Sequence, residues 1–198
     1  MTRLSIGRWF AFGSVLLSLT VWEGCGYTLR GNTRPFFEQN EIHTLYVAPV
    51  KNNSYKAGIE ITVYNALRKR FAQGGYVRLV DSPVVADAEM DAWVMDASYT
   101  PAAITRADQI APQGSGPDNV QIASTYNVNL SVKFTLKGRG KELWSNELSR
   151  TKTFAATTYL GALGSTSALI NESEFEQTLN ELSTSLVTDA EESINTLF

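Results

Sequence analysis

The sequence of 198 residues contains few of the residue types that most often carry chemistry, with one cysteine, Cys25, and one histidine, His43. A single cysteine excludes an internal disulfide framework and a cysteine-rich zinc site. A single histidine excludes a site of several histidines, and it leaves few candidates for a general base. The composition therefore argues against an enzyme, and we expect neither a metal centre nor a bound cofactor.

Neither positive nor negative charge predominates in the chain. The chain has 17 Lys and Arg against 20 Asp and Glu, and only 19% of its residues are charged. A weakly acidic chain has no global field that would recruit nucleic acid, so we expect no nucleic-acid partner. Because 43% of the residues are hydrophobic, the length favours one well-packed domain over disorder or two domains.

Long hydrophobic runs are absent as well. The mostly apolar stretch from Trp9 to Val21 follows two basic residues, Arg3 and Arg8. A helix that spans a bilayer needs about twenty apolar residues, and this stretch is shorter. A basic start followed by an apolar run of this length predicts a secretory signal peptide over residues 1–24.

Gly24-Cys25 resembles the end of a bacterial lipobox, in which the cysteine becomes the lipidated first residue of the mature chain. Trp22 and Glu23 depart from the usual lipobox, and the alternative is an unmodified thiol behind an uncleaved anchor. We expect Cys25 to carry lipid, because the only cysteine of the chain lies where the signal ends. Several acyl chains would then anchor the protein stably. Gly26 follows the cysteine in place of the aspartate that often retains lipoproteins in the inner membrane, so export to the outer membrane is expected.

The mature chain is predicted to comprise a lipidated N-terminus and tether over 25–43 and a single domain over 44–198. Two sets of apolar residues at helical spacing, each forming one stripe of a helix, indicate that this domain has a packed core. The expected elements are strands at 44–50, 76–80, 91–100, 126–136 and 142–154, a helix from between Ser54 and Gly58 to Gly74, a loop over 101–124, and a helix from Asn171. The helical stripes are Ile59, Val63, Leu67 and Phe71, and Phe175, Leu179, Leu182, Leu186, Ala190, Ile194 and Leu197, with the acidic residues of the last helix off its stripe.

This order predicts an α+β fold, with a small, mostly antiparallel four-stranded sheet and two amphipathic helices packed on one of its faces. In this count the segments 76–80 and 91–100 are two parts of one split strand. Gly138-Arg139-Gly140 is a compact turn between the last two strands. A turn symmetric about Arg139 would place Phe134 across from Trp144 and Leu130 across from Leu148, with both pairs on the buried face.

Basic residues gather at the tip of this hairpin. Lys137, Arg139 and Lys141 lie at the turn, and Lys133 lies on the exposed strand face that leads to it. Arg and Lys suit the phosphate or carboxylate groups of an anionic ligand. The alternative is an ordinary charged tip that keeps the hairpin soluble. A second cluster, Asp81, Asp87, Glu89 and Asp91, lacks the ligand spacing and the glycine of a calcium loop, and we expect it to be solvated.

The segment Cys25-Gly-Tyr-Thr-Leu-Arg-Gly31 resembles the start of mature proteins of the LPS-assembly lipoprotein (LptE) family. The resemblance continues through Ile42–Val50, the first helix, Ala86-Asp87-Ala88 before a strand, the hairpin and the closing helix. It implies an outer-membrane lipoprotein that faces the periplasm, with two helices on a four-stranded sheet.

The resemblance also implies that the protein plugs the lumen of an LptD-like β-barrel, supports folding of that barrel, binds lipopolysaccharide (LPS) and helps to place it in the outer leaflet. Some family members bind LPS through basic residues at loop tips. The corresponding candidates are Lys137, Arg139 and Lys141, with Arg106 of the long loop as a weaker one. The alternative is a lipoprotein scaffold or accessory subunit of another envelope assembly or secretion complex.

Overall fold

The computed structural model describes residues 36–106, 121–156 and 164–196. The chain divides into two units, Met1–Arg34 and Pro35–Phe198, and all described residues belong to the second. The predicted signal peptide, Cys25 and Leu197 lie outside the described residues. In chain order the elements are α2 (Phe36–Gln39), β1 (Thr44–Val47), β2 (Lys51–Asn52), α3 (Ile59–Gly74), β3 (Arg78–Val80), the 3-10 helix η1 (Pro83–Val85), β4 (Ala88–Arg106), β5 (Gln121–Gly138), β6 (Lys141–Ala155) and α4 (Gly164–Asn195).

The fold is α+β, as predicted, but its sheet is mixed and has six strands. The order is β3-β1-β4-β5-β6, and the short β2 also pairs with β4. β1 is parallel to both β3 and β4, whereas β4, β5 and β6 form antiparallel ladders. Strands β1 and β3 can pair in parallel because helix α3 connects them, since parallel neighbours need a crossover connection. Segments 76–80 and 91–100 are thus not one split strand, because they lie on opposite sides of β1.

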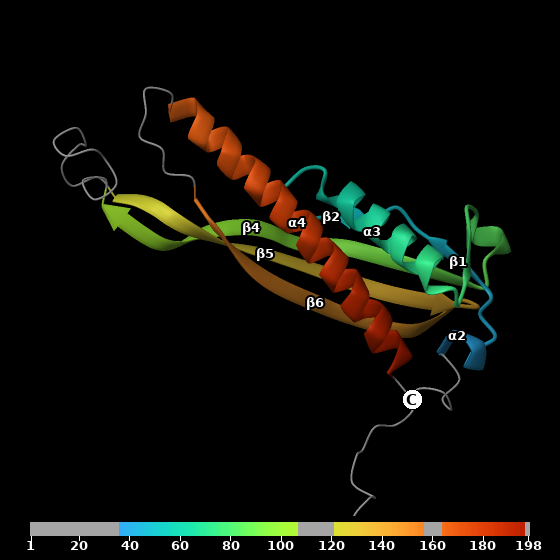
Figure 1. Ribbon diagram of the computed structural model, residues 1–198. Helices are drawn as coiled ribbons and strands as arrows, with labels where there is room; N and C mark the ends of the chain where they lie inside the picture. Colours follow the sequence, from blue (N-terminus) through green and yellow to red (C-terminus); the bar gives the residue numbers. More distant parts are fainter. Residues whose placement is uncertain (1–35, 107–120, 157–163, 197–198) are drawn as a thin grey trace, which may run out of the picture. The chain divides into compact units, whose positions relative to one another are not determined.

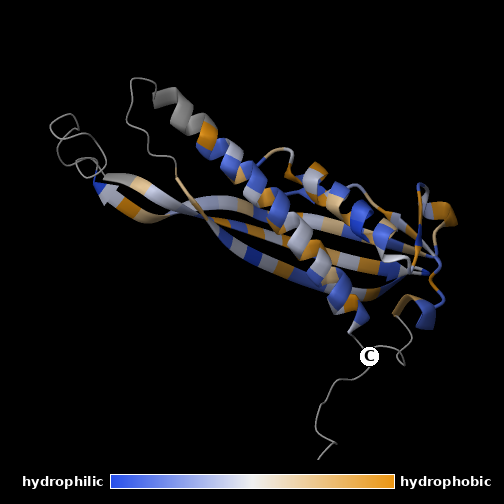
Figure 2. Ribbon diagram, in the orientation of Figure 1, coloured by the Kyte–Doolittle hydropathy of each residue, from blue (hydrophilic) through white to orange (hydrophobic). Residues whose placement is uncertain are grey.

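Helices α3 and α4 lie side by side on one face of the sheet (Figure 1). The predicted stripe of α3 is buried in full, and so are the described members of the α4 stripe. Along β5 the even-numbered residues from Val128 to Leu136 are buried, and the strands change from apolar to polar colours residue by residue (Figure 2). The opposite face of the sheet, which carries the odd-numbered residues of β5 and none of the described helices, is called the open face below.

The expected tether contributes to the core. Phe36 and Phe37 of α2 and the following Ile42 are all buried, and the Phe37 ring meets Phe71 of α3 edge-on. The last part of the segment 25–43 therefore packs on the domain. Aromatic residues bury much surface for their number, so a four-residue helix can be held by two of them.

Helix α4 differs from expectation in two ways. It begins at Gly164, ahead of Asn171, and one acidic residue of its C-terminal part is not solvated. Glu191 is 2% exposed and forms an ion pair with Arg70 of α3. A buried carboxylate requires such a partner, and α3 supplies it from a cluster of basic residues near its C-terminal end.

The predicted loop over 101–124 is shorter than expected. Residues 101–106 continue β4, and residues 121–124 begin β5. Pro101 lacks the N–H that a regular ladder needs, and register shifts at Pro101/Ala103 and Ala103/Ile104 allow the pairing to continue past it. Strand β4 therefore continues past Pro101, where the sequence predicted that it would end.

The hairpin between β5 and β6 has a different register from the predicted one. Leu136 lies across from Trp144, and Val132 lies across from Leu148. A two-residue turn closed by Gly138 and Lys141, together with a register shift after Leu136, displaces the pairs by two positions. Because side chains alternate with a period of two, such a shift keeps each residue on its predicted face.

Candidate functional site

The turn of the β5–β6 hairpin fixes where the basic residues point. Arg139 and Gly140 both have positive φ, at 50° and 77°. Two positive φ values in a two-residue turn are typical of type I′, whose twist matches that of the paired strands. The tight turn therefore holds Arg139 and Lys141 at the end of the sheet, next to the start of β4.

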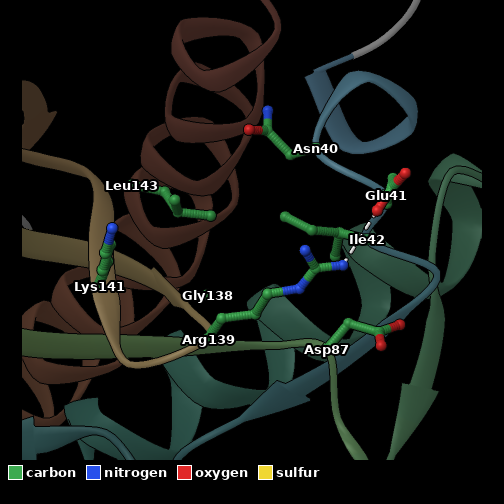
Figure 3. A pocket seen from close by; sticks show the side chains of 8 residues that line it. All are labelled: Asn40, Glu41, Ile42, Asp87, Gly138, Arg139, Lys141 and Leu143. Carbon is green, nitrogen blue, oxygen red and sulfur yellow. Dashed lines mark hydrogen bonds and ion pairs between the residues drawn. The ribbon is translucent and has the colours of Figure 1, made fainter.

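A hollow of about 220 Å³ lies at this end, between the hairpin and the segment that follows α2 (Figure 3). Its walls come from three parts of the chain: the α2–β1 connection, the residue before β4, and the hairpin. Its lining residues are Asn40, Glu41, Ile42, Asp87, Gly138, Arg139, Lys141 and Leu143. The hollow thus combines two cations and two carboxylates with two apolar side chains.

Arg139 reaches across the hollow to Glu41 (Figure 3). Its Nη2 lies 3.1 Å from Glu41 Oε2, and the two side chains are 75% and 74% exposed. Such a solvated pair contributes about 0–1 kcal/mol. An anionic group entering the hollow could therefore replace the Glu41 carboxylate at little cost.

Lys141 and Lys137 differ in their surroundings. Lys141 lines the hollow, and in the part of the chain that the structure describes it forms no ion pair. Lys137 Nζ lies 2.5 Å from Asp91 Oδ2, and this hydrogen bond, reinforced by the charge of Asp91, raises the pKa of Lys137. Lys137 is therefore engaged on the open face and does not line the hollow.

Asp87 forms one wall of the hollow, whereas the sequence placed it only in a solvated acidic cluster and in the segment Ala86-Asp87-Ala88 that resembles the family. Its Oδ2 accepts hydrogen bonds from the Thr44 hydroxyl at 2.8 Å and from the amides of His43 and Thr44 at 3.0 and 2.8 Å. These donors, the hydroxyl first, lower the pKa of the Asp87 carboxyl. Glu41 was also missed, because it lies in the segment taken for a tether, where no sequence signal marked it.

Arg106 is not part of this cluster. It ends β4, whereas Ala88 at the start of β4 pairs with Gly138 of the hairpin. The 19 residues of β4 span roughly 60 Å at roughly 3.3 Å per residue. The structure thus brings Arg139 and Lys141 together, leaves Lys137 beside them on the open face, and places Arg106 at the opposite end of the sheet.

The described residues include no group of three or more His, Cys, Asp and Glu arranged to hold a metal ion. Among the described helices, none combines the length and apolar character needed to cross a bilayer. The fold and the hollow together define a small α+β domain with a charged hollow at one end of its sheet.

The family of this domain follows from the comparison with known proteins. Residues 42–191 match the LptE family, described as lipopolysaccharide-assembly. The match covers most of the chain, so the protein belongs to the LptE family and has a role in lipopolysaccharide assembly. The comparison with curated proteins gives no match.

Several solved structures are similar. A putative lipoprotein from Caulobacter crescentus is 14% identical, with a TM-score of 0.44, over 75% of this chain and 88% of that one. The uncharacterized lipoprotein B from Nitrosomonas europaea is 13% identical, with a TM-score of 0.45, over 78% and 83%. The rare lipoprotein B from Shewanella oneidensis is 16% identical, with a TM-score of 0.38, over 73% and 89%.

Proposed function

We propose that this protein is an outer-membrane lipoprotein, anchored through Cys25, that binds LPS at the hollow beside the β5–β6 turn and works together with an LptD-like β-barrel. The observation that carries the proposal is the pair of cations at the hollow, Arg139 and Lys141, of which one is held only by an exposed carboxylate and the other forms no ion pair among the described residues. Membership of the LptE family supports LPS as the anionic ligand.

The chemistry of the hollow suits the phosphorylated part of a glycolipid. A guanidinium can hold two phosphate oxygens at once, and a lysine ammonium adds a compact point charge. Ile42 and Leu143 provide apolar surface beside these cations. No covalent step is required, because cations offered here replace the divalent ions that bridge neighbouring LPS molecules and so lower the cost of separating them.

The open face supports the proposed association with a barrel. Its side chains are mostly Ser, Thr and Asn, and they bond to one another across strands, as when Thr153 donates to Asn127 and Ser149 to Asn129. A surface of this kind suits the polar lumen of a large outer-membrane barrel. Purification from the native membrane tests this part, since recovery with another envelope complex in place of a barrel would favour the scaffold alternative.

The LPS site is tested by the double variant Arg139→Asn/Lys141→Gln. Asparagine tolerates positive φ, so the turn keeps its conformation while both cations are removed. We expect LPS affinity in a pull-down to fall at least about tenfold, because charge-assisted hydrogen bonds contribute about 1.5–3 kcal/mol each before discounting for exposure.

The matched control is Arg106→Gln, which removes a cation at the other end of the sheet. We expect the control to bind LPS as the unaltered protein does, and both variants to associate with the barrel. Equal LPS affinity for the double variant and the unaltered protein would refute the assignment of the site.

A further inference from the structure

The open face carries a tryptophan between two lysines. Lys51 of β2 pairs with Trp93 of β4, and Trp93 pairs with Lys133 of β5, so three strands place these residues in one row. Adjacent strands lie about 4.8 Å apart, which puts both ammonium groups within reach of one small ligand. Trp93 is 38% exposed, whereas Trp144 on the opposite face is 7% exposed.

Neither lysine of the row forms an ion pair within the described ranges, although Glu147 of β6 lies across from Lys133 in the ladder. Lys51 Nζ lies 4.4 Å from the centroid of the Trp93 ring. The neighbouring carboxylates have other partners: Asp91 pairs with Lys137, Asp96 accepts from Ser98 and Asn129, and Glu147 accepts from Ser131. The row therefore combines an exposed indole with two lysines that form no ion pair among the described contacts.

The row has a chemistry that selects among ligands. The face of an indole ring is electron-rich and attracts the C–H groups on one face of a sugar ring. Lysine ammonium groups bind phosphate or carboxylate as point charges. The contact between Lys51 and the ring contributes about 0.5–1 kcal/mol at an exposed site, so a ligand can displace it. Met95, which a β-bulge leaves 40% exposed, adds apolar surface on the adjoining stretch of β4.

We propose that Lys51, Trp93 and Lys133 form a second binding site, which takes an acidic saccharide, and that its ligand is the phosphorylated sugar core of LPS. The identity of the glycolipid rests on the proposed function above, but the preference for an acidic sugar rests on the row itself. Lys133 precedes Gly138 by five residues on β5, roughly 17 Å at about 3.4 Å per residue. The two sites could thus hold two parts of one molecule, with lipid phosphates at the hollow and core sugars on the open face.

The experiment measures protection of Trp93 by a ligand without lipid. The full chain is titrated with delipidated, phosphorylated core oligosaccharide while acrylamide quenches tryptophan fluorescence. The signal of Trp93 is obtained as the difference from a Trp93→Phe variant. We expect saturable protection that lowers quenching of Trp93 at least about twofold, and we expect no protection by the dephosphorylated oligosaccharide or by a neutral glucan of similar length.

The variant Lys51→Gln/Lys133→Gln should bind the oligosaccharide at least about fivefold more weakly. Lys69→Gln is the matched control, since Lys69 is an exposed lysine of α3 without an ion pair among the described contacts. Absence of protection, equal protection by the neutral glucan, or unchanged affinity of the double variant would each overturn the second site.

The same titration separates this proposal from the proposed function. Arg139→Asn/Lys141→Gln should leave protection by the delipidated oligosaccharide unchanged while it weakens binding of intact LPS. If intact LPS fails to bind the unaltered protein while the oligosaccharide protects Trp93, the proposed function is wrong and the saccharide site stands. If intact LPS binds at the hollow and Trp93 is never protected, the proposed function stands and the saccharide site is wrong.

Discussion

Asp87 acts at the scale of a single residue but ties together separate parts of the fold. Its carboxylate accepts three hydrogen bonds from His43 and Thr44, while its own amide donates to the backbone carbonyl of Thr44 at 3.1 Å. These contacts fix the start of β1 against the start of β4. They also hold the segment that carries Glu41 in place, so the hollow depends on this residue.

Replacing Asp87 by asparagine should destabilise the protein at neutral pH. The pKa of Asp87 lies below 3.8 in the folded state, so its stabilising contribution is present above pH 3.8 and is lost as the pH falls through the lowered pKa. We expect a cost of roughly 1 kcal/mol at pH 7 after discounting for partial exposure. The measurement is the urea denaturation midpoint of both proteins between pH 7 and pH 2.5, where the gap should close below about pH 3.8.

Asp81→Asn is the control for this prediction, because the Asp81 side chain is 86% exposed and pairs with the exposed Arg68. Its midpoint should stay close to that of the unaltered protein at every pH. A gap for Asp87→Asn that is constant from pH 7 to pH 2.5 would mean that the carboxylate charge is not what stabilises this contact.

At the scale of elements, the helical period and the strand alternation of apolar residues predicted the helices and long strands better than turn residues predicted where strands end. The stripe from Ile59 to Phe71 repeats every four residues, and burial of that face alone explains why α3 was predictable. Glu191 escaped prediction because its burial depends on Arg70, a residue far away in the sequence. The short strands β2 and β3 have too few residues for a periodic signal, and they exist because they pair with longer neighbours.

The candidate site was predictable in part, because strand alternation and the turn residues predict the hairpin. The hairpin in turn places Arg139 and Lys141 at its tip, at one end of the sheet. Glu41 and Asp87 could not be assigned to the hollow, since only the tertiary fold brings the α2–β1 connection beside the turn. Arg106 was grouped with the tip because a long loop was expected where β4 in fact continues.

The hairpin turn provides a test at the element scale. Gly140 has φ of 77°, and a Cβ built on it would meet no atom within 4 Å. The cost of Gly140→Ala is therefore conformational, and we expect a loss of about 1 kcal/mol in the free energy of unfolding. Gly140→Asn should cost less, because asparagine tolerates positive φ. Denaturant titration of the three proteins should rank them Gly, Asn, Ala, and equal stability of the alanine variant would contradict the turn assignment.

At the scale of the whole described unit, the sheet has one packed face and one open face. The proposed saccharide site lies on the open face, and the hollow lies at the end of the sheet. Helices α3 and α4 supply the core of one face, so the open face and the end of the sheet remain for ligands and partners. Helix α2 belongs to the packed side through Phe37 and Phe71. The segment that leads from the N-terminal unit into the domain is thus part of the folded structure next to the hollow.

This last point predicts where the stable domain begins. A chain that starts at Pro35 keeps Phe36, Phe37 and Ile42 in the core, and a chain that starts at Thr44 loses all three. Burial of a large apolar side chain contributes about 1.5–3 kcal/mol, so the shorter chain should lose at least about 4 kcal/mol, a large part of the stability of an ordinary domain. Urea denaturation and limited proteolysis of the two chains measure the difference. Within the longer chain, Phe37→Ala should cost about 3–5 kcal/mol and the exposed Glu38→Ala almost nothing. Equal midpoints for the two chains would show that the packing of α2 contributes nothing to stability, and the hollow would then lack a fixed wall at Glu41.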